Sequence, residues 1–228
     1  MKTPKLLLAS ICVVLFSCSV QGQGNFVNLN FEASTLATLP PGTYGSEVSS
    51  TDAIPGWSAF LDTNEVTQVL QNNLTLGNAS ISILGPHWSF PNIIEGQYTL
   101  VLQPGAGSGG LVSASVSQTG LVPLTAQSLE FKAFGHTPFS VSLGGQALDV
   151  VALGSGANYF LYGASIPGSY AGQPASLTIT ALAGPNSADY FDSCAFLSSP
   201  IPEPGILGIL FTGLLVLTVY LGKTGRIR

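Results

Sequence analysis

Residues 128–134 read Ser-Leu-Glu-Phe-Lys-Ala-Phe, so that Leu129, Phe131 and Ala133 alternate with Glu130 and Lys132. Successive side chains of a β-strand point to opposite faces of its sheet. The stretch therefore predicts a strand with one buried and one solvated face. The same alternation recurs in residues 112–117, Val-Ser-Ala-Ser-Val-Ser.

Similar segments continue along the chain and are separated by turn residues. The further strand candidates are residues 27–31, 80–84, 97–103, 140–143, 147–153, 158–166, 176–182 and 190–197. Gly144-Gly145 has the composition of a two-residue hairpin turn, and residues 104–110 are a glycine-rich loop. Outside the terminal segments, no clear 3.6-residue period indicates a helix. The pattern predicts an all-β fold, an antiparallel two-sheet sandwich of the jelly-roll type, over residues 24–199.

The charge of this central segment excludes one class of partner. Only 7% of the 228 residues are charged, where an ordinary soluble domain has roughly 25%. Residues 24–200 hold ten acids and one base, Lys132, which gives a net charge of −9. Because nucleic-acid binding depends on cations that neutralise phosphates, we expect no DNA or RNA partner.

The N-terminus resembles a secretory signal peptide. Lys2 and Lys5 precede an apolar stretch at residues 6–16, which is too short to span a bilayer. We predict a signal helix at residues 1–22, with cleavage after Gly22; cleavage after Ser19 is a second option. The sequence Leu-Phe-Ser-Cys at residues 15–18 approaches a lipobox, so lipidation of Cys18 is an alternative.

The C-terminus has the composition of a membrane anchor. Residues 205–222 form an uncharged run of 18 residues, which as a helix is about 27 Å long and close to the thickness of a bilayer core. Three bases follow it, Lys223, Arg226 and Arg228. By the positive-inside rule this tail stays cytoplasmic, so we predict that everything before Pro202 is exported.

The order of features at this end resembles the PEP-CTERM sorting signal of Gram-negative bacteria. Pro202-Glu203-Pro204, the apolar span and the short basic tail cover residues 201–228. The resemblance implies recognition by an exosortase, a protease of the inner membrane, which cuts near the motif and passes the protein to the cell surface or extracellular polymer. The two prolines also disfavour a helix and hold Glu203 in extended backbone.

Four short pieces of the central segment resemble the galactose-binding-like jelly rolls of secreted bacterial proteins. They are residues 26–32 (Phe-Val-Asn-Leu-Asn-Phe-Glu), 54–57 (Ile-Pro-Gly-Trp), 117–120 (Ser-Gln-Thr-Gly) and 189–192 (Asp-Tyr-Phe-Asp). The resemblance implies that the first and last strands lie close together and that their acids hold a structural Ca²⁺. Glu32 and Asp192 are the candidate ligands, because Ca²⁺ prefers carboxylate oxygens. The alternative is that both are ordinary solvated acids.

The sequence does not indicate catalysis. After signal removal Cys194 is the remaining cysteine, in the apolar alternation of the last strand candidate, which favours a buried residue over a nucleophile. His87 and His136 stand outside any zinc-protease pattern. A glycosidase pair among the ten acids is left open, but we expect no enzyme.

Binding of a polysaccharide is the stronger alternative. Tyr44, Trp57, His87 and Trp88 lie in predicted loops, where an exposed aromatic residue could stack on a sugar ring. Of these, Trp57 is expected in the core. The sequence thus predicts an exported protein, anchored in the membrane and then sorted to the surface. Its expected role is structural or adhesive in the envelope or extracellular polymeric matrix. The alternative is a carbohydrate-binding module for exopolysaccharide; a polysaccharide-active enzyme is third.

Overall fold

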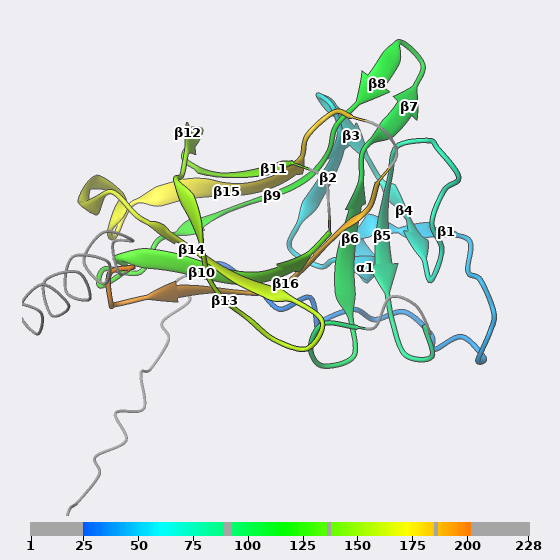
Figure 1. Cartoon of the computed structure of the whole chain (residues 1–228), viewed down its shortest axis with the longest axis horizontal. Helices are drawn as coiled ribbons and strands as arrows, with labels where there is room; N and C mark the ends of the chain where they lie inside the picture. Colours follow the sequence, from blue (N-terminus) through cyan, green and yellow to red (C-terminus); the bar gives the residue numbers. More distant parts are fainter. Residues whose placement is uncertain (1–24, 89–92, 136–137, 185–186, 202–228) are drawn as a thin grey trace, which may run out of the picture.

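Two β-sheets stack face to face in the computed structural model (Figure 1), which describes residues 25–88, 93–135, 138–184 and 187–201. In spatial order the eight-stranded sheet consists of β1 (Glu47–Ser49), β4 (Gln68–Gln71), β5 (Ser80–Leu84), β6 (Thr99–Gln103), β16 (Asp189–Leu197), β10 (Ser128–Phe134), β14 (Phe160–Ser165) and β13 (Val150–Ser155). The six-stranded sheet consists of β12 (Gln146–Ala147), β11 (Phe139–Leu143), β15 (Pro174–Ala181), β9 (Ala114–Leu121), β2 (Ser58–Leu61) and β3 (Asn64–Val66). The two-sheet sandwich predicted from the sequence is confirmed.

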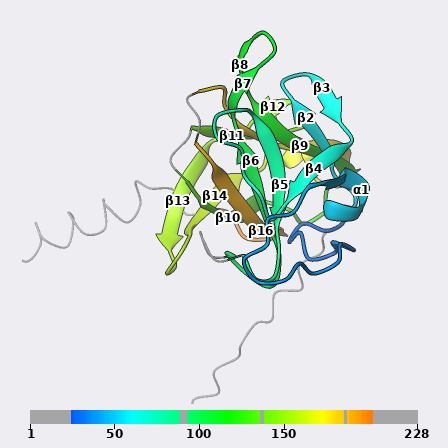
Figure 2. The same ribbon diagram turned by 90° about the vertical axis from the view of Figure 1, so that its right-hand side faces the viewer.

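Smaller elements complete the described part. A hairpin of β7 (Gly105–Gly107) and β8 (Gly110–Val112) projects from one end of the sandwich (Figure 1), where the sequence predicted a loop. The short helix α1 (Ser50–Ala53) lies beside β4 at the edge of the sandwich (Figure 2), and a 3-10 helix spans Gly168–Tyr170. No helix among the described residues is long and apolar enough to cross a membrane.

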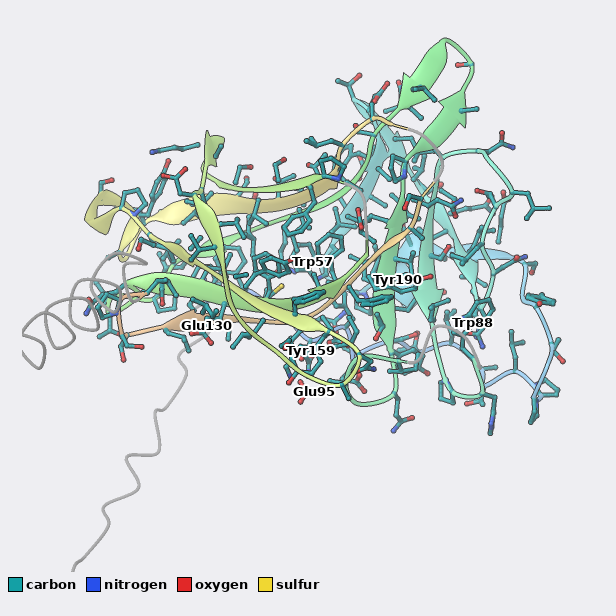
Figure 3. The ribbon with its side chains drawn as sticks, viewed as in Figure 1. Trp57, Trp88, Glu95, Glu130, Tyr159 and Tyr190 are labelled. Carbon is teal, nitrogen blue, oxygen red and sulfur yellow. The ribbon has the colours of Figure 1, made fainter. Side chains whose placement is uncertain are left out.

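The core lies between the sheets and follows the alternation of the strands. In β10, Leu129, Phe131 and Ala133 are buried, whereas Glu130 and Lys132 point outward. Trp57 is buried between the two sheets, as predicted, and its Nε1 donates to the Asn28 carbonyl at 3.0 Å (Figure 3). The predicted Gly144-Gly145 turn joins β11 to β12, and both glycines have the positive φ that such a turn requires.

Two strand expectations are wrong. Residues 27–31 form turns in which Asn28 and Phe31 have positive φ. Leu29 and Phe31 are nevertheless fully buried. The apolar pattern therefore predicted the burial of these side chains correctly, but not the conformation of their backbone. Pairing is antiparallel throughout the described strands except at β4 and β5, which run parallel. The antiparallel expectation fails there because residues 72–79 carry the chain back to the same end of the sheet before β5 begins.

The outer face of the eight-stranded sheet is partly covered. All five residues of β5 and all five of β6 are buried, although their side chains alternate between the two faces. Residues 85–88 and 93–98, here called the cover loop, contribute Trp88, Ile93 and Ile94 to a second apolar cluster with Val101 and Tyr190. This cluster shields the outer face and is separate from the main core.

Candidate functional site

The predicted ligand residues His87 and Trp88 lie in the cover loop, directly after β5. His87 has a positive φ of 71° and an exposed side chain, whereas Trp88 is half-buried against the second cluster. The indole Nε1 of Trp88 is buried and has no hydrogen-bond partner among the described residues. Trp88 therefore combines an apolar anchor with an unused donor.

The structure gives Trp88 an aromatic neighbour from a distant part of the sequence. The Tyr44 ring meets the Trp88 ring edge to face, with 5.9 Å between the ring centroids. Tyr44 is 72% exposed, so most of its ring faces solvent. We call Tyr44, His87 and Trp88 the aromatic site.

Asparagine side chains hold the segments that carry this site. The Asn72 Oδ1 accepts the Gly85 N–H at 2.6 Å, and its Nδ2 donates to the Pro86 carbonyl at 3.4 Å. The Asn73 Nδ2 donates to the Gly45 carbonyl at 3.0 Å. Since β4 and β5 are parallel and β1 is antiparallel to β4, these three segments meet at one end of the strands.

A groove of about 540 Å³ lies where β1, β4 and β5 approach β3. Its polar lining comprises two carboxylates, two amides and three hydroxyls, from Glu47, Glu65, Gln68, Asn78, Thr67, Thr75 and Ser80. Leu61, Val66 and Ile81 add apolar surface. This mixture of donors, acceptors and apolar wall suits a polyhydroxylated ligand, and the volume is typical of small-molecule sites.

One residue of the groove is close in sequence to the aromatic site. Glu47 lines the groove and is three residues beyond Tyr44, so the two Cα atoms are at most about 11 Å apart. The other polar lining residues lie mostly near the start of β4 and β5, whereas Tyr44 and Trp88 lie near the other end of these strands. The sequence indicated the aromatic residues, but it missed Glu47, Glu65 and Gln68, because no motif distinguishes them from other surface residues.

The two candidate calcium ligands reach the same segment, the end of the cover loop. Glu32 accepts the backbone N–H groups of Gln97 and Tyr98 at 3.0 Å. Asp192 is 1% exposed, and its Oδ2 accepts from the Glu95 N–H at 3.2 Å and from the Thr99 hydroxyl at 2.9 Å. Its Oδ1 accepts the Ser193 N–H at 2.7 Å. Both carboxylates therefore bind the cover loop.

This donor set differs from that of a cation site. N–H and O–H groups already donate to both carboxylates, so a cation at these oxygens shares them with the cover loop. Gly96, with a φ of 62°, lies so close to Glu32 that a Cβ there would overlap the carboxylate. The described residues contain no group of three or more His, Cys, Asp or Glu that could hold a metal ion. The assignment of Glu32 and Asp192 as Ca²⁺ ligands stays a prediction.

Burial has a direct electrostatic effect on Asp192. Desolvation raises the pKa of its carboxyl to about 7, against the opposing hydrogen bonds from Thr99, Ser193 and Glu95. The nearby charge of Glu32 contributes a smaller part of this rise in pKa. The carboxyl thus titrates near neutral pH.

No catalytic arrangement is visible among the described residues. Cys194 is buried, as predicted, and burial raises the pKa of its thiol, which disfavours the nucleophilic thiolate. His87 is not hydrogen-bonded to a described nucleophile, and His136 lies outside the described residues. The expectation that the chain is not an enzyme stays a prediction.

The targeting segments also lie outside the described part. These are the signal peptide at residues 1–22 with Cys18, the Pro202-Glu203-Pro204 motif, the span 205–222, and the tail with Lys223, Arg226 and Arg228. Their assignments remain predictions from the sequence.

No model of a known protein family matches the chain, and no curated protein sequence matches it. Among solved structures, TmCBM61 in complex with β-1,4-galactotriose shares 11% identity at a TM-score of 0.41, covering 78% of this chain and 100% of that one. The enzymatically active domain of bacteriophage CBA120 tailspike protein 4 shares 14% identity at a TM-score of 0.40, covering 65% of this chain and 20% of that one. A family 29 carbohydrate-binding module shares 11% identity at a TM-score of 0.35, covering 65% and 94%. At these scores the likeness identifies no family, and the site is interpreted from its own residues.

Proposed function

We propose that this chain is an exported protein that adheres to exopolysaccharide through the aromatic site and the groove along β1, β4 and β5. The observation that carries the proposal is an aromatic ring, Tyr44, that is 72% exposed and lies three residues before Glu47 of this polar groove. Sugar rings present apolar C–H faces and hydroxyl edges. Tyr44 and Trp88 offer aromatic surface for such faces, and the groove offers carboxylates, amides and hydroxyls for the edges.

The proposal also includes the cellular location of the protein. The signal peptide and the Pro202-Glu203-Pro204 motif support export, membrane anchoring and exosortase processing, with a structural or adhesive role in the envelope or polymeric matrix. We also propose that the two-sheet sandwich is of the jelly-roll type and that it is related to galactose-binding-like domains. Deleting the exosortase should leave the chain in the membrane fraction; unchanged release would contradict the sorting step. This role requires no catalysis by the chain.

The binding is tested by affinity electrophoresis. The full-length protein is run through gels that contain the exopolysaccharide of the producing strain. Tyr44→Ala and Trp88→Ala should each weaken retention about threefold to tenfold, since an aromatic contact contributes about 0.5–1.5 kcal/mol. Tyr44→Ala is the decisive variant, because an exposed residue is removed without disturbing the core.

Phe160→Ala is the matched control, because Phe160 is also an exposed aromatic residue, 45% exposed, on the distant strand β14. Its retention should equal that of the unmodified protein. If Tyr44→Ala also leaves retention unchanged, the aromatic site does not bind the polymer and the proposal fails.

A further inference from the structure

A second pocket opens on the outer face of the eight-stranded sheet, away from the aromatic site. It has a volume of about 320 Å³, and its lining includes Asn30, Glu95, Glu130, Lys132, Leu161 and Ser193. Glu130 and Lys132 project outward from β10, and the labelled residues Glu95, Glu130 and Tyr159 lie on the same side of the sandwich (Figure 3). From β5 to β10 the sheet order crosses β6 and β16, which is about 14 Å at the usual strand spacing.

A β-bulge shapes the floor of this pocket. Glu130 pairs with Ala195 and Lys132 pairs with Asp192, so Ser193 and Cys194 of β16 both face Phe131 of β10. Ser193 has a positive φ of 52°, and the Cys194 N–H leaves the ladder to bind the Leu29 carbonyl at 2.9 Å. Bulges of this kind are frequent next to binding sites, because they redirect side chains.

The pocket contains Lys132, the single base of residues 24–200. Its Nζ lies 2.7 Å from the Glu95 Oε2 and 5.0 Å from the centroid of the Tyr159 ring, and its side chain is 18% exposed. The hydrogen bond from Lys132, followed by that from Ser193, lowers the pKa of Glu95. The ammonium is therefore held in one place. Since it has three donors and Glu95 uses one, it keeps donor capacity for a ligand.

Glu130 is the carboxylate of the pocket that has no protein donor among the described residues. Its carboxyl is partly buried, and this burial raises its pKa. No described donor forms a hydrogen bond with it, although Lys132 is two residues away on the same face of β10. The oxygens of Glu130 remain open to solvent, so the O–H donors of a ligand can replace water at this carboxylate.

We infer that this pocket binds one neutral sugar unit, with adjacent hydroxyls donating to Glu130 and accepting from Lys132. The inference rests on the proposed function only for the ligand class, because it uses none of the residues of the aromatic site or the groove. Two carboxylates and one ammonium give the pocket a net charge of −1, which repels uronic acids and other anions. A second sugar site makes the domain bivalent and strengthens its hold on a polymer without new contacts at the first site.

The inference is tested by NMR. The full-length protein is titrated with methyl glucoside, methyl galactoside and methyl mannoside at millimolar concentrations, and its amide chemical shifts are followed. At least one glycoside should shift the amides of residues 130–132 and 193–195. Glu130→Gln keeps the size of the side chain and removes its charge, and it should weaken this binding about tenfold, because a hydrogen bond to a charged group contributes about 1.5–3 kcal/mol. Asp149→Asn, at an exposed acid outside both sites, should change nothing.

The outcomes separate the two sites. Trp88→Ala should reduce polymer retention and leave the shifts at residues 130–132 intact, so a failure at one site does not imply failure at the other. Absence of shifts at the pocket with all three glycosides overturns the inference. Glucosamine and glucuronic acid are titrated in the same way. Shifts at the pocket with one of these two and with none of the methyl glycosides also overturn the inference, because the occupant would then be an amine or an anion. Equal binding by Glu130→Gln also overturns the inference, because the sugar hydroxyls are assigned to donate to that carboxylate.

Discussion

The inner face of the eight-stranded sheet packs against the six-stranded sheet, whereas part of its outer face is covered by a loop. On the inner face the contacts are apolar side chains at alternating positions, such as Leu129 and Phe131 in β10. On the outer face a smaller apolar cluster is supplemented by two carboxylates, Glu32 and Asp192, that bind backbone N–H groups of the cover loop. The difference shows that one sheet can be held by packing on one side and by long-range hydrogen bonds on the other.

The largest expected effect is on the inner face. Phe131 is fully buried and contacts the rings of Phe139, Tyr162 and Phe191, with centroid distances of 5.8, 5.6 and 6.4 Å. Phe131→Ala should lower the free energy of unfolding by about 3–5 kcal/mol, because it removes buried surface and leaves a cavity. Chemical denaturation measures the change.

Leu124→Ala is the control for that substitution, since Leu124 is 82% exposed. It should change stability by less than about 0.5 kcal/mol. A loss below about 1 kcal/mol for Phe131→Ala would show that packing does not dominate the inner face, and the contrast between the two faces would disappear.

The next effect is a pH dependence from the outer face. The folded-state pKa of Asp192 is raised from 3.8 to about 7, chiefly by burial. Its stabilising contribution is therefore fully present below pH 3.8 and is lost as the pH rises through about 7. From pH 5 to pH 8 this one group should lower the free energy of unfolding by roughly 2–3 kcal/mol. Thermal melts in EDTA, compared with Asp192→Asn, measure the slope.

Asp192→Asn should be less stable than the unmodified protein at pH 5 but lack its decline toward pH 8. The same melts repeated with Ca²⁺ in place of EDTA address the calcium prediction. An unchanged melting midpoint in Ca²⁺ agrees with carboxylates whose oxygens accept hydrogen bonds from the cover loop instead of binding the metal. A higher midpoint with Ca²⁺ at pH 8, absent in Asp192→Asn, would establish the metal site and remove the proposed reason for the slope.

The sequence predicted the inner face better than the outer one, for a physical reason. Alternation is a local signal, so β10 and the burial of Cys194 followed directly from neighbouring residues. The order of strands in each sheet and the parallel β4–β5 pair depend on contacts between distant residues, which a single sequence does not show.

The candidate sites illustrate the same limit. His87 and Trp88 were predicted from residue type and loop position, but Tyr44 becomes the neighbour of Trp88 only through the fold. Glu32 and Asp192 were paired by resemblance, and the structure places both at the cover loop with amide donors. The pocket at Glu130 depends on a bulge at Ser193, and no local pattern in β16 predicts its position.

The smallest expected effect isolates one carboxylate of the outer face. Glu32→Gln keeps the side chain's size but replaces a charged acceptor with a neutral one, so it should cost about 1–2 kcal/mol. The loss should be local: the amides of Gln97 and Tyr98 should exchange hydrogen about fivefold to thirtyfold faster, while amides of β10 keep their rates. Asp149→Asn, which removes an exposed acid without a described hydrogen bond, serves as control. If exchange at Gln97 and Tyr98 is unchanged, Glu32 does not hold the cover loop, and the contrast between the two faces of the sheet rests on Asp192 alone.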